Sequence, residues 1–297
     1  MKPEKEKWLL LIVLSLIWGS SFILIKKSLE SFHNPYQVGA LRVFISGIML
    51  APIALMNIKK FPRKDLLWIS IAAFCGNFIP MFLYPIAETK ISSSIAGVVN
   101  SMMPIFVIMV GTLFWKTKTT SRQVAGIVIS FAGVLLMMVS GDNGSETPIF
   151  YISLVLFATL LYAVSTTTAA EKLVHIPAKL LSSFVFFYVL ALPSLLALVF
   201  SGFFSEFDFS KEKWVGLGYV SLLSVFGTGL AMMLQYRLMN ISGALFASTV
   251  TLLMPIVAVI WGFIDGERLS LFQIFGGLII LTGLIFLRSK KTKTTEK

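Results

Sequence analysis

Ten long stretches of this chain carry almost no charged residues, and they restrict it to a membrane fold. Each is about 17–25 residues long, and a helix rising 1.5 Å per residue needs about 20 residues to cross a hydrocarbon core about 30 Å thick. The chain is only 13% charged, against about 25% in soluble domains. The sequence therefore predicts an all-α membrane protein with ten transmembrane helices. The ten stretches are residues 8–25, 36–57, 66–86, 91–115, 123–140, 149–170, 180–201, 214–235, 242–264 and 270–287.

The basic residues of the loops predict which way these helices run. With a cytoplasmic N-terminus, 18 of the 25 Lys and Arg residues fall on the cytoplasmic side, 6 fall outside, and Arg42 lies within a helix. Short cytoplasmic loops carry such an excess of Lys and Arg. We therefore expect a multi-pass protein of the cytoplasmic (inner or plasma) membrane with both termini in the cytoplasm. The net charge of +11 then reflects topology and anionic lipid, and no nucleic-acid partner is expected.

The second half of the chain repeats the first. "AGVVNSMMPIFVIMVGTLFW" (96–115) aligns with "ASTVTLLMPIVAVIWGFIDG" (247–266) at an offset of 151 residues, and the glycines of the fifth and tenth stretches align at an offset of 150. The predicted units are residues 1–145 and 146–297, with five helices each. Because five is odd, the second unit enters the membrane from the opposite side. The predicted architecture is thus two inverted five-helix repeats, which in secondary transporters place the substrate site between the halves at mid-membrane.

Several short motifs resemble one transporter family. These are "WGSSF" in the first stretch, the fourth stretch rich in small residues and leading to Pro in each half, and "GERLS" (266–270) before a glycine-rich last stretch. Together they resemble the EamA-like branch of the drug/metabolite transporter superfamily. The resemblance implies an exporter or permease of small metabolites such as amino acids. The halves differ at Gly266–Arg268, which align with Trp115–Thr117, so the repeat predicts no symmetric role for Glu267.

Polar and aromatic residues near the middle of the stretches predict a central cavity. Trp18 lies beside three small residues in "SLIWGSSF" (15–22), and Tyr162 lies beside Ser and Thr in "LLYAVSTT" (160–167). The small residues alone are also explained by close helix contacts, and each polar residue alone by an interhelical hydrogen bond. Three pairs related by the repeat favour a shared polar cavity. The residues expected to line it and bind substrate are Trp18, Ser21, Asn77, Tyr84, Asn100, Tyr162, Thr166, Gln235 and Thr251.

Three further residues lie within the stretches. Pro104 and Pro255 each remove a backbone hydrogen bond and are expected to kink their helices, either as fixed bends or as hinges. Arg42 lies about 9 Å into its helix at 1.5 Å per residue. It is expected either to reach the outer surface or backbone carbonyls, or to attract an anionic group of the substrate.

Missing residue types exclude several functions. No Asp or Glu falls within the ten stretches, with Glu88 at a loop edge, and both His residues fall in loops. Exchange or uniport is therefore expected at least as much as proton coupling. No HExxH motif or carboxylate cluster is present, so no metal, cofactor or enzyme activity is predicted. A channel-like facilitator is the alternative, followed by an intramembrane enzyme or a membrane scaffold. The expected partners are a small-molecule substrate and the lipid bilayer, and a monomer is compatible with the sequence.

Overall fold

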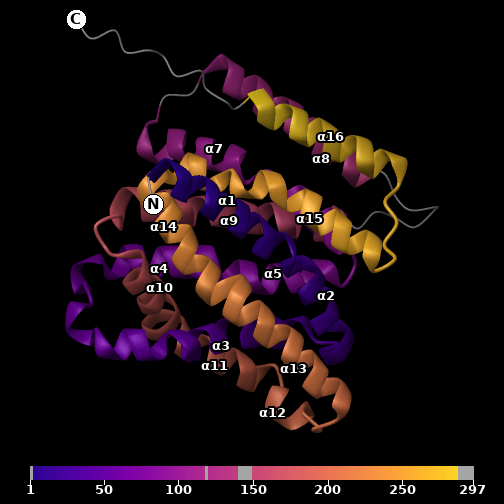
Figure 1. Ribbon diagram of the computed structural model, residues 1–297. Coiled ribbons are helices and arrows are strands. Elements are labelled where there is room, and N and C mark those ends of the chain that lie inside the picture. Colours follow the sequence, from indigo (N-terminus) through magenta and orange to yellow (C-terminus); the bar gives the residue numbers. More distant parts are fainter. Residues whose placement is uncertain (1–2, 118–119, 140–148, 287–297) are drawn as a thin grey trace, which may run out of the picture.

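The computed structural model describes residues 3–117, 120–139 and 149–286, and its regular elements there are all helical (Figure 1). The predicted boundary at residues 145 and 146 and the tail from residue 288 lie outside the described residues. The α-helices are α1 (Pro3–Gly19), α2 (Ser21–Phe32), α3 (Pro35–Met56), α4 (Leu66–Ala73), α5 (Ile79–Glu88), α6 (Ser93–Asn100), α7 (Met103–Trp115), α8 (Ser121–Val139), α9 (Ile149–Lys172), α10 (Ala178–Ser183), α11 (Ala191–Phe200), α12 (Phe203–Glu206), α13 (Lys211–Ser224), α14 (Ala231–Ser248), α15 (Val250–Ile264) and α16 (Leu271–Phe286). Two 3₁₀ turns, η1 (Ile58–Lys60) and η2 (Arg63–Asp65), precede α4.

The helices are long and apolar enough for a multi-pass membrane protein. Within the described ranges, seven helical runs have the length and composition to cross a bilayer, and three shorter apolar helices cover Ser121–Leu136, Val250–Ile264 and Leu271–Gly283. Large apolar side chains face outward, including Leu113 (75% exposed) and Phe263 (79% exposed), as expected where lipid is the solvent. Ten crossings in an inverted repeat stay a prediction.

Many of the apolar runs are broken near their middle, which the sequence did not predict. The first run divides at Ser20 into α1 and α2, and the fourth divides at Ser101–Met102 into α6 and α7. Three others contain π-helical segments: η3 (Phe74–Phe78), η4 (Phe184–Leu190) and η5 (Val225–Leu230). Such segments bond to the fifth residue back instead of the fourth, and they occur often at functional sites.

The turn between the predicted eighth and ninth helices is a single glycine. Residues 211–248 form one long helical run, but Gly243 within it has φ +79° and ψ 167°. This backbone conformation is one that glycine adopts without steric cost. The chain therefore leaves the direction of the eighth stretch at Gly243, close to the predicted start of the ninth at residue 242.

Helices α8 and α16 pack side by side along one edge of the molecule (Figure 1). A methyl group on Gly133 would lie 2.6 Å from the carbonyl oxygen of Gly276, and one on Gly283 would lie 2.6 Å from that of Gly126. Only glycine allows backbones this close. Gly126 aligns with Gly276 and Gly133 with Gly283. Each contact therefore joins the first glycine of one helix to the second glycine of the other, and the helices cross in a locally symmetric way.

Candidate substrate cavity

A cavity lies in the interior among helices of both halves. Residues from α1, α2, α3, η3, α5, α6, α7, α9, η5, α14 and α15 line it, and it holds about 680 Å³ of empty space with its opening included. Eight of the nine residues expected from the sequence are among its lining residues: Trp18, Ser21, Tyr84, Asn100, Tyr162, Thr166, Gln235 and Thr251. Substrate binding by these residues stays a prediction.

Asn77 is the expected residue that the structure does not place at the cavity. It is completely buried in η3, and its amide nitrogen lies 3.5 Å from the carbonyl oxygen of Ala72. Its neighbour Gly76 lines the cavity instead. Successive residues of a helix point about 100° apart, so the side chain of Asn77 is directed into the helix packing behind the wall.

The small residues beside Trp18 make room for a π-helical segment of the other half. The indole Nε1 of Trp18 donates a hydrogen bond to the carbonyl oxygen of Gly227 in η5, at 2.9 Å. A methyl group on Gly227 would lie 2.7 Å from the hydroxyl oxygen of Ser21. Ser21 and Gly227 thus let helix and π segment meet closely, while the tryptophan satisfies its only side-chain hydrogen-bond donor inside the protein. Gly19 faces α15 instead, where a methyl group on it would lie 2.5 Å from the Cβ of Val257.

The second half makes a matching contact with the first. The hydroxyl of Ser165 in α9 donates to the carbonyl oxygen of Ala72 at 2.9 Å, and Gly76 in η3 leaves the space for that side chain. Gly76 and Gly227 are 151 residues apart, as are the starts of η3 and η5. Each half therefore presents a widened glycine-containing segment to a serine of the other half.

An aromatic and polar network forms one wall of the cavity. The rings of Tyr84 and Tyr162 stack with centroids 5.9 Å apart. The hydroxyl of Tyr84 donates to the side-chain oxygen of Asn100 at 2.5 Å, and the hydroxyl of Thr159 donates to the same oxygen at 3.4 Å. Thr159 was not among the residues predicted from the sequence, because a buried threonine in an apolar helix usually bonds only the backbone of its own helix. Thr159 makes such a bond as well as its contact with Asn100.

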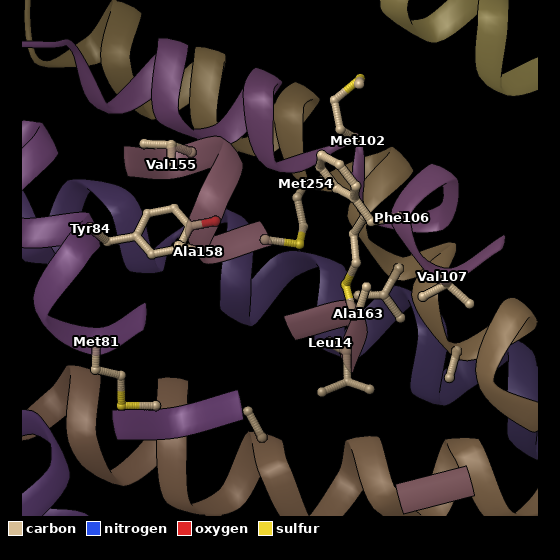
Figure 2. Close-up of a cluster of buried hydrophobic side chains, with 14 of the residues drawn as sticks. Leu14, Met81, Tyr84, Met102, Phe106, Val107, Val155, Ala158, Ala163 and Met254 are labelled. Atoms are coloured by element: carbon tan, nitrogen blue, oxygen red, sulfur yellow. The ribbon is translucent and has the colours of Figure 1, made fainter. Parts of the chain in front are cut away.

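Methionines complete the wall, and several of them also belong to the buried hydrophobic core. Met81 and Met254 are 2% and 3% exposed, and Figure 2 shows both close to Tyr84 in the buried cluster. Met103 and Met232 also line the cavity. Thioether side chains are polarizable and adaptable, which suits contact with variable apolar groups.

Arg42 is the buried cation of this site. It is 5% exposed and lines the cavity, so the expectation that it reaches the outer surface is wrong. Its Nε donates to the hydroxyl of Thr228, in η5, at 2.8 Å. A guanidinium has five N–H donors, and a planar fork of them is well suited to a carboxylate. The alternative in which Arg42 attracts an anionic group therefore remains.

Gln235 supplies the complementary acceptor. Its amide nitrogen lies 3.5 Å from the carbonyl oxygen of Ala247. Its side-chain oxygen is buried and accepts no hydrogen bond from any residue that the structure describes. Buried polar atoms are nearly always paired, so an acceptor of this kind in a cavity wall points to a ligand donor.

One of the two prolines expected to kink a helix lies at a helix break, and the other lies within a helix. Pro104 is at the beginning of α7, directly after the break at Ser101–Met102, and Pro255 lies inside α15. Proline fits the first turn of a helix because its missing N–H is unneeded there. Whether these sites bend during function stays a prediction.

Charged side chains of the two halves meet at one end of the cavity region. With two serines that bond to them they form the ionic cluster, which consists of Lys26, Lys27, Ser93, Ser94, Asp265 and Glu267. Lys26 lies 2.6 Å from Asp265 and 3.0 Å from Glu267, and Lys27 lies 2.6 Å from Asp265. The carboxylate of Glu267 also accepts the backbone N–H groups of Ser93 and Ser94 at 3.1 Å each. Anions are stabilised at a helix N-terminus such as that of α6.

This setting also fixes the charge of Glu267. Burial by itself raises the pKa of its carboxyl, but hydrogen bonds from Ser94, Ser93 and Lys26 outweigh burial and leave the pKa below its ordinary value of 4.5. The sequence predicted only a topological role for the basic residues of the loops, among them Lys26. The asymmetry between the halves at Glu267 now has a structural reason, because Glu267 pairs with α2 and α6 of the first half.

Glu88 lies at the loop edge where the sequence placed it, but it is buried, which the sequence did not predict. It was expected at a loop edge, outside the apolar stretches. It is the last residue of α5, lies inside the apolar run Arg63–Glu88, and is only 8% exposed. Its burial comes from neighbouring helices that are distant in the sequence, so position along the chain did not reveal it.

Comparison with known proteins agrees with this architecture. The family model of the EamA-like transporter family matches residues 7–139 and again residues 149–289. An "Uncharacterized transporter" of Archaeoglobus fulgidus is 26% identical over 96% of this chain and 100% of its own length. The "Uncharacterized inner membrane transporter YedA" of Escherichia coli K12 is 27% identical over 88% of this chain and 83% of its own length. A solved crystal structure shares the fold, with TM-score 0.63 and 16% identity over 95% of this chain and 96% of the other. This chain belongs to the EamA-like transporter family.

Proposed function

We propose that this chain is a secondary transporter that moves small amphiphilic solutes, such as amino acids, across the cytoplasmic membrane by alternating access. The observation that carries the proposal is the chemistry of the cavity wall. Arg42 offers a buried cation, Gln235 offers a buried acceptor, and Trp18, Tyr84 and Tyr162 offer aromatic faces. An amino acid has a carboxylate for the guanidinium, an ammonium for the amide oxygen and a side chain for the aromatic wall.

The same wall disfavours other solutes. Multiply charged phosphates are usually held by several Arg or Lys side chains, and Arg42 is the one basic residue among those lining the cavity in the described chain. A purely apolar solute would leave the Gln235 oxygen without a partner and would add none to the bond of Arg42 with Thr228, which is costly in a buried site. A solute with one anionic group and one donor group therefore fits best.

The proposal includes the inverted repeat, with units 1–145 and 146–297 and ten crossings. Three observations support it. The π segments η3 and η5 are 151 residues apart, the glycine contacts of α8 and α16 exchange aligned positions, and the family model matches each half separately. A cavity between two such halves can be exposed to either side by rocking one half against the other.

The loop charges support an orientation with both termini in the cytoplasm. The ionic cluster is then at the outer end, where it joins the first half to the second. One chain builds the whole cavity, so a monomer in the bilayer is a sufficient functional unit. Export and uptake are both compatible with this arrangement.

Counterflow in liposomes tests the proposal. Purified protein is reconstituted into vesicles that are preloaded with a mixed amino-acid pool, and labelled amino acids are offered outside without a pH gradient. A carrier with alternating access gives transient labelled uptake that depends on internal solute, because exchange is faster than net flux. Arg268→Gln serves as a control for the loss of an arginine, since Arg268 is exposed and does not line the cavity.

The outcomes separate the alternatives. Uptake stimulated by internal solute supports the carrier. Equal uptake with and without internal solute would indicate the channel-like facilitator instead. No uptake of any amino acid would contradict the substrate class and direct the search to other small metabolites.

A further inference from the structure

Glu88 is a buried carboxyl group without a hydrogen bond. It is 8% exposed, and both of its carboxyl oxygens are enclosed and accept no hydrogen bond from any residue in the described part of the chain. It lies four residues after Tyr84, which lines the cavity. Residues four apart lie on the same face of a helix. Glu88 is therefore one helical turn beyond the cavity wall, toward the ionic cluster.

The charged groups around Glu88 are engaged with other partners. The helices packed against α5 are α2, α3, α6 and α9, with η3 continuing it. From these and from the loop after α15, the charges that act on Glu88 are those of Glu267, Arg42 and Lys26. Lys26 bonds Asp265 and Glu267, and the Nε of Arg42 bonds Thr228. The other titratable groups of the cavity wall are Tyr84 and Tyr162, and Lys27 and Asp265 complete the ionic cluster.

Glu88 and Glu267 lie at the same end of the cavity region but differ in their hydrogen-bond donors. Glu267 accepts hydrogen bonds from two backbone N–H groups, two serine hydroxyls and Lys26. That set of donors stabilises an ionised carboxylate. Glu88 has none of these donors, and an unpaired carboxylate is unstable in a water-free interior, where the group becomes neutral by binding a proton. These surroundings therefore favour an ionised Glu267 and a neutral Glu88.

We propose that Glu88 is a proton-binding site that couples solute movement to proton movement. In the conformation seen here, with the ionic cluster formed, the Glu88 carboxyl is neutral. When the cluster separates and this end opens to water, the O–H bond of the acid breaks, the proton passes to water, and the carboxylate is hydrated. When this end has closed and the cavity is open to the opposite side, a proton from water on that side passes through the cavity to the carboxylate oxygen and re-forms the O–H bond. A full cycle therefore carries one proton across the membrane.

The coupling follows from linkage between the two equilibria. Proton binding favours the closed conformation, so closure must favour proton binding by the same factor. The inference rests on the proposed alternating access, because it needs an end of the cavity that opens and closes. It adds that protons drive the cycle. The sequence shows no Asp or Glu within the ten apolar stretches that could bind such a proton.

Infrared spectroscopy on purified full-length protein tests the protonation directly. A neutral carboxylic acid has a carbonyl stretching band separate from the bands of amides and carboxylates. We expect this band near neutral pH in the wild-type protein, its loss in Glu88→Gln, and its retention in Glu212→Gln. Glu212 is an exposed glutamate of α13 and is the matched control. Absence of the band in the wild-type protein, or its persistence in Glu88→Gln, overturns the proposal.

Transport measurements test the coupling and separate it from the proposed function. Glu88→Gln has the shape of the neutral acid, so it should fold and should retain exchange in counterflow. In the wild-type protein, an imposed pH gradient in one of its two directions should drive a several-fold accumulation of solute. Glu88→Gln should lose this accumulation. Accumulation in Glu88→Gln equal to that of the wild-type protein overturns the inference and leaves the transporter intact. Failure of counterflow in every protein contradicts the proposed function, while the infrared result still decides the state of Glu88. If Glu88→Gln does not fold, Glu88→Asp replaces it, and an unmoved acid band in that variant overturns the assignment.

Discussion

Arg42 and Gln235 give the cavity its polarity at the scale of single residues. The guanidinium is buried and bonds Thr228 through Nε, and the Gln235 oxygen is buried without a partner among the described residues. Both groups pay a desolvation cost that a bound solute would offset by completing their hydrogen bonds. Their positions therefore define which chemical groups of a solute the site can recognise.

The first prediction concerns the charge of Arg42. Arg42→Gln should weaken binding of an amino acid about ten- to hundredfold, because a hydrogen bond to a charged group contributes about 1.5–3 kcal/mol. The amide of the same amino acid, which has no carboxylate, should be affected much less. Half-saturation in counterflow measures both solutes, with Arg268→Gln as the control. An equal loss for the acid and its amide would show that Arg42 does not bind the carboxylate.

The second prediction concerns the aromatic wall. Trp18→Ala and Tyr162→Ala should each reduce counterflow by about fivefold or more, because an aromatic contact contributes about 1 kcal/mol beyond its buried area. Membrane insertion should be normal, as measured by the amount of protein extracted from membranes. Trp18→Phe keeps the ring and removes the donor to Gly227, so it separates the two roles. Normal counterflow in both alanine variants would refute the wall assignment.

Single positions differ in how well the sequence predicted them. Trp18, Tyr84 and Gln235 were predicted at the cavity because mid-helix polar groups in a bilayer must face the protein interior. Asn77 was misplaced because one helical position, about 100°, separates the cavity wall from the packing behind it. The burial of Glu88 was not predicted, because it depends on helices α2, α3 and α9, whose approach no local pattern records.

At the scale of elements, the π segments shape the cavity. η3 and η5 each widen a helix beside a glycine, and each glycine receives a serine of the other half. The sequence predicted the small residues and the repeat but not the π geometry. A change of hydrogen-bond partner from the fourth to the fifth residue back has no periodic signature in the side chains.

The third prediction concerns this fit. Gly227→Ala should destabilise the protein by about 1–3 kcal/mol, because the added methyl overlaps the hydroxyl of Ser21 in a packed site. Ser21→Gly should restore most of that stability in the double variant. Gly218→Ala is the control, since nothing lies within 4 Å of a methyl at that position. Thermal unfolding in detergent measures all four proteins. Equal stability of Gly227→Ala and Gly218→Ala would contradict the close contact.

At the scale of the whole molecule, the ionic cluster joins the two halves at one end. Lys26 and Lys27 belong to α2 of the first half, while Asp265 and Glu267 lie in the loop after α15 of the second. Bonds of this kind can break and reform as the halves move, because water replaces each partner when the end opens. The cluster therefore fits a reversible closure.

The fourth prediction is the pH dependence of the stability that Glu267 contributes through the ionic cluster. The pKa of Glu267 is lowered in the folded protein relative to its ordinary value of 4.5. Its contribution to stability should therefore be complete above pH 4.5 and should be lost as the pH falls through the lowered folded value. The thermal midpoint of the wild-type protein should exceed that of Glu267→Gln at neutral pH, and the difference should shrink on acidification. A difference that does not change with pH would contradict an ionised, bonded Glu267.

The fifth prediction tests the central claim, that the cavity opens by separation of the halves at the ionic cluster. Cysteines replace Lys26 and Asp265 in a chain whose one native cysteine, Cys75, is changed to serine. A cleavable bifunctional thiol reagent then joins the two positions, and counterflow is measured before joining, after joining and after cleavage. Each single-cysteine variant receives the same treatment as a control. We expect joining to abolish counterflow in the double variant alone and cleavage to restore it. Full counterflow by the joined protein would contradict alternating access at this end.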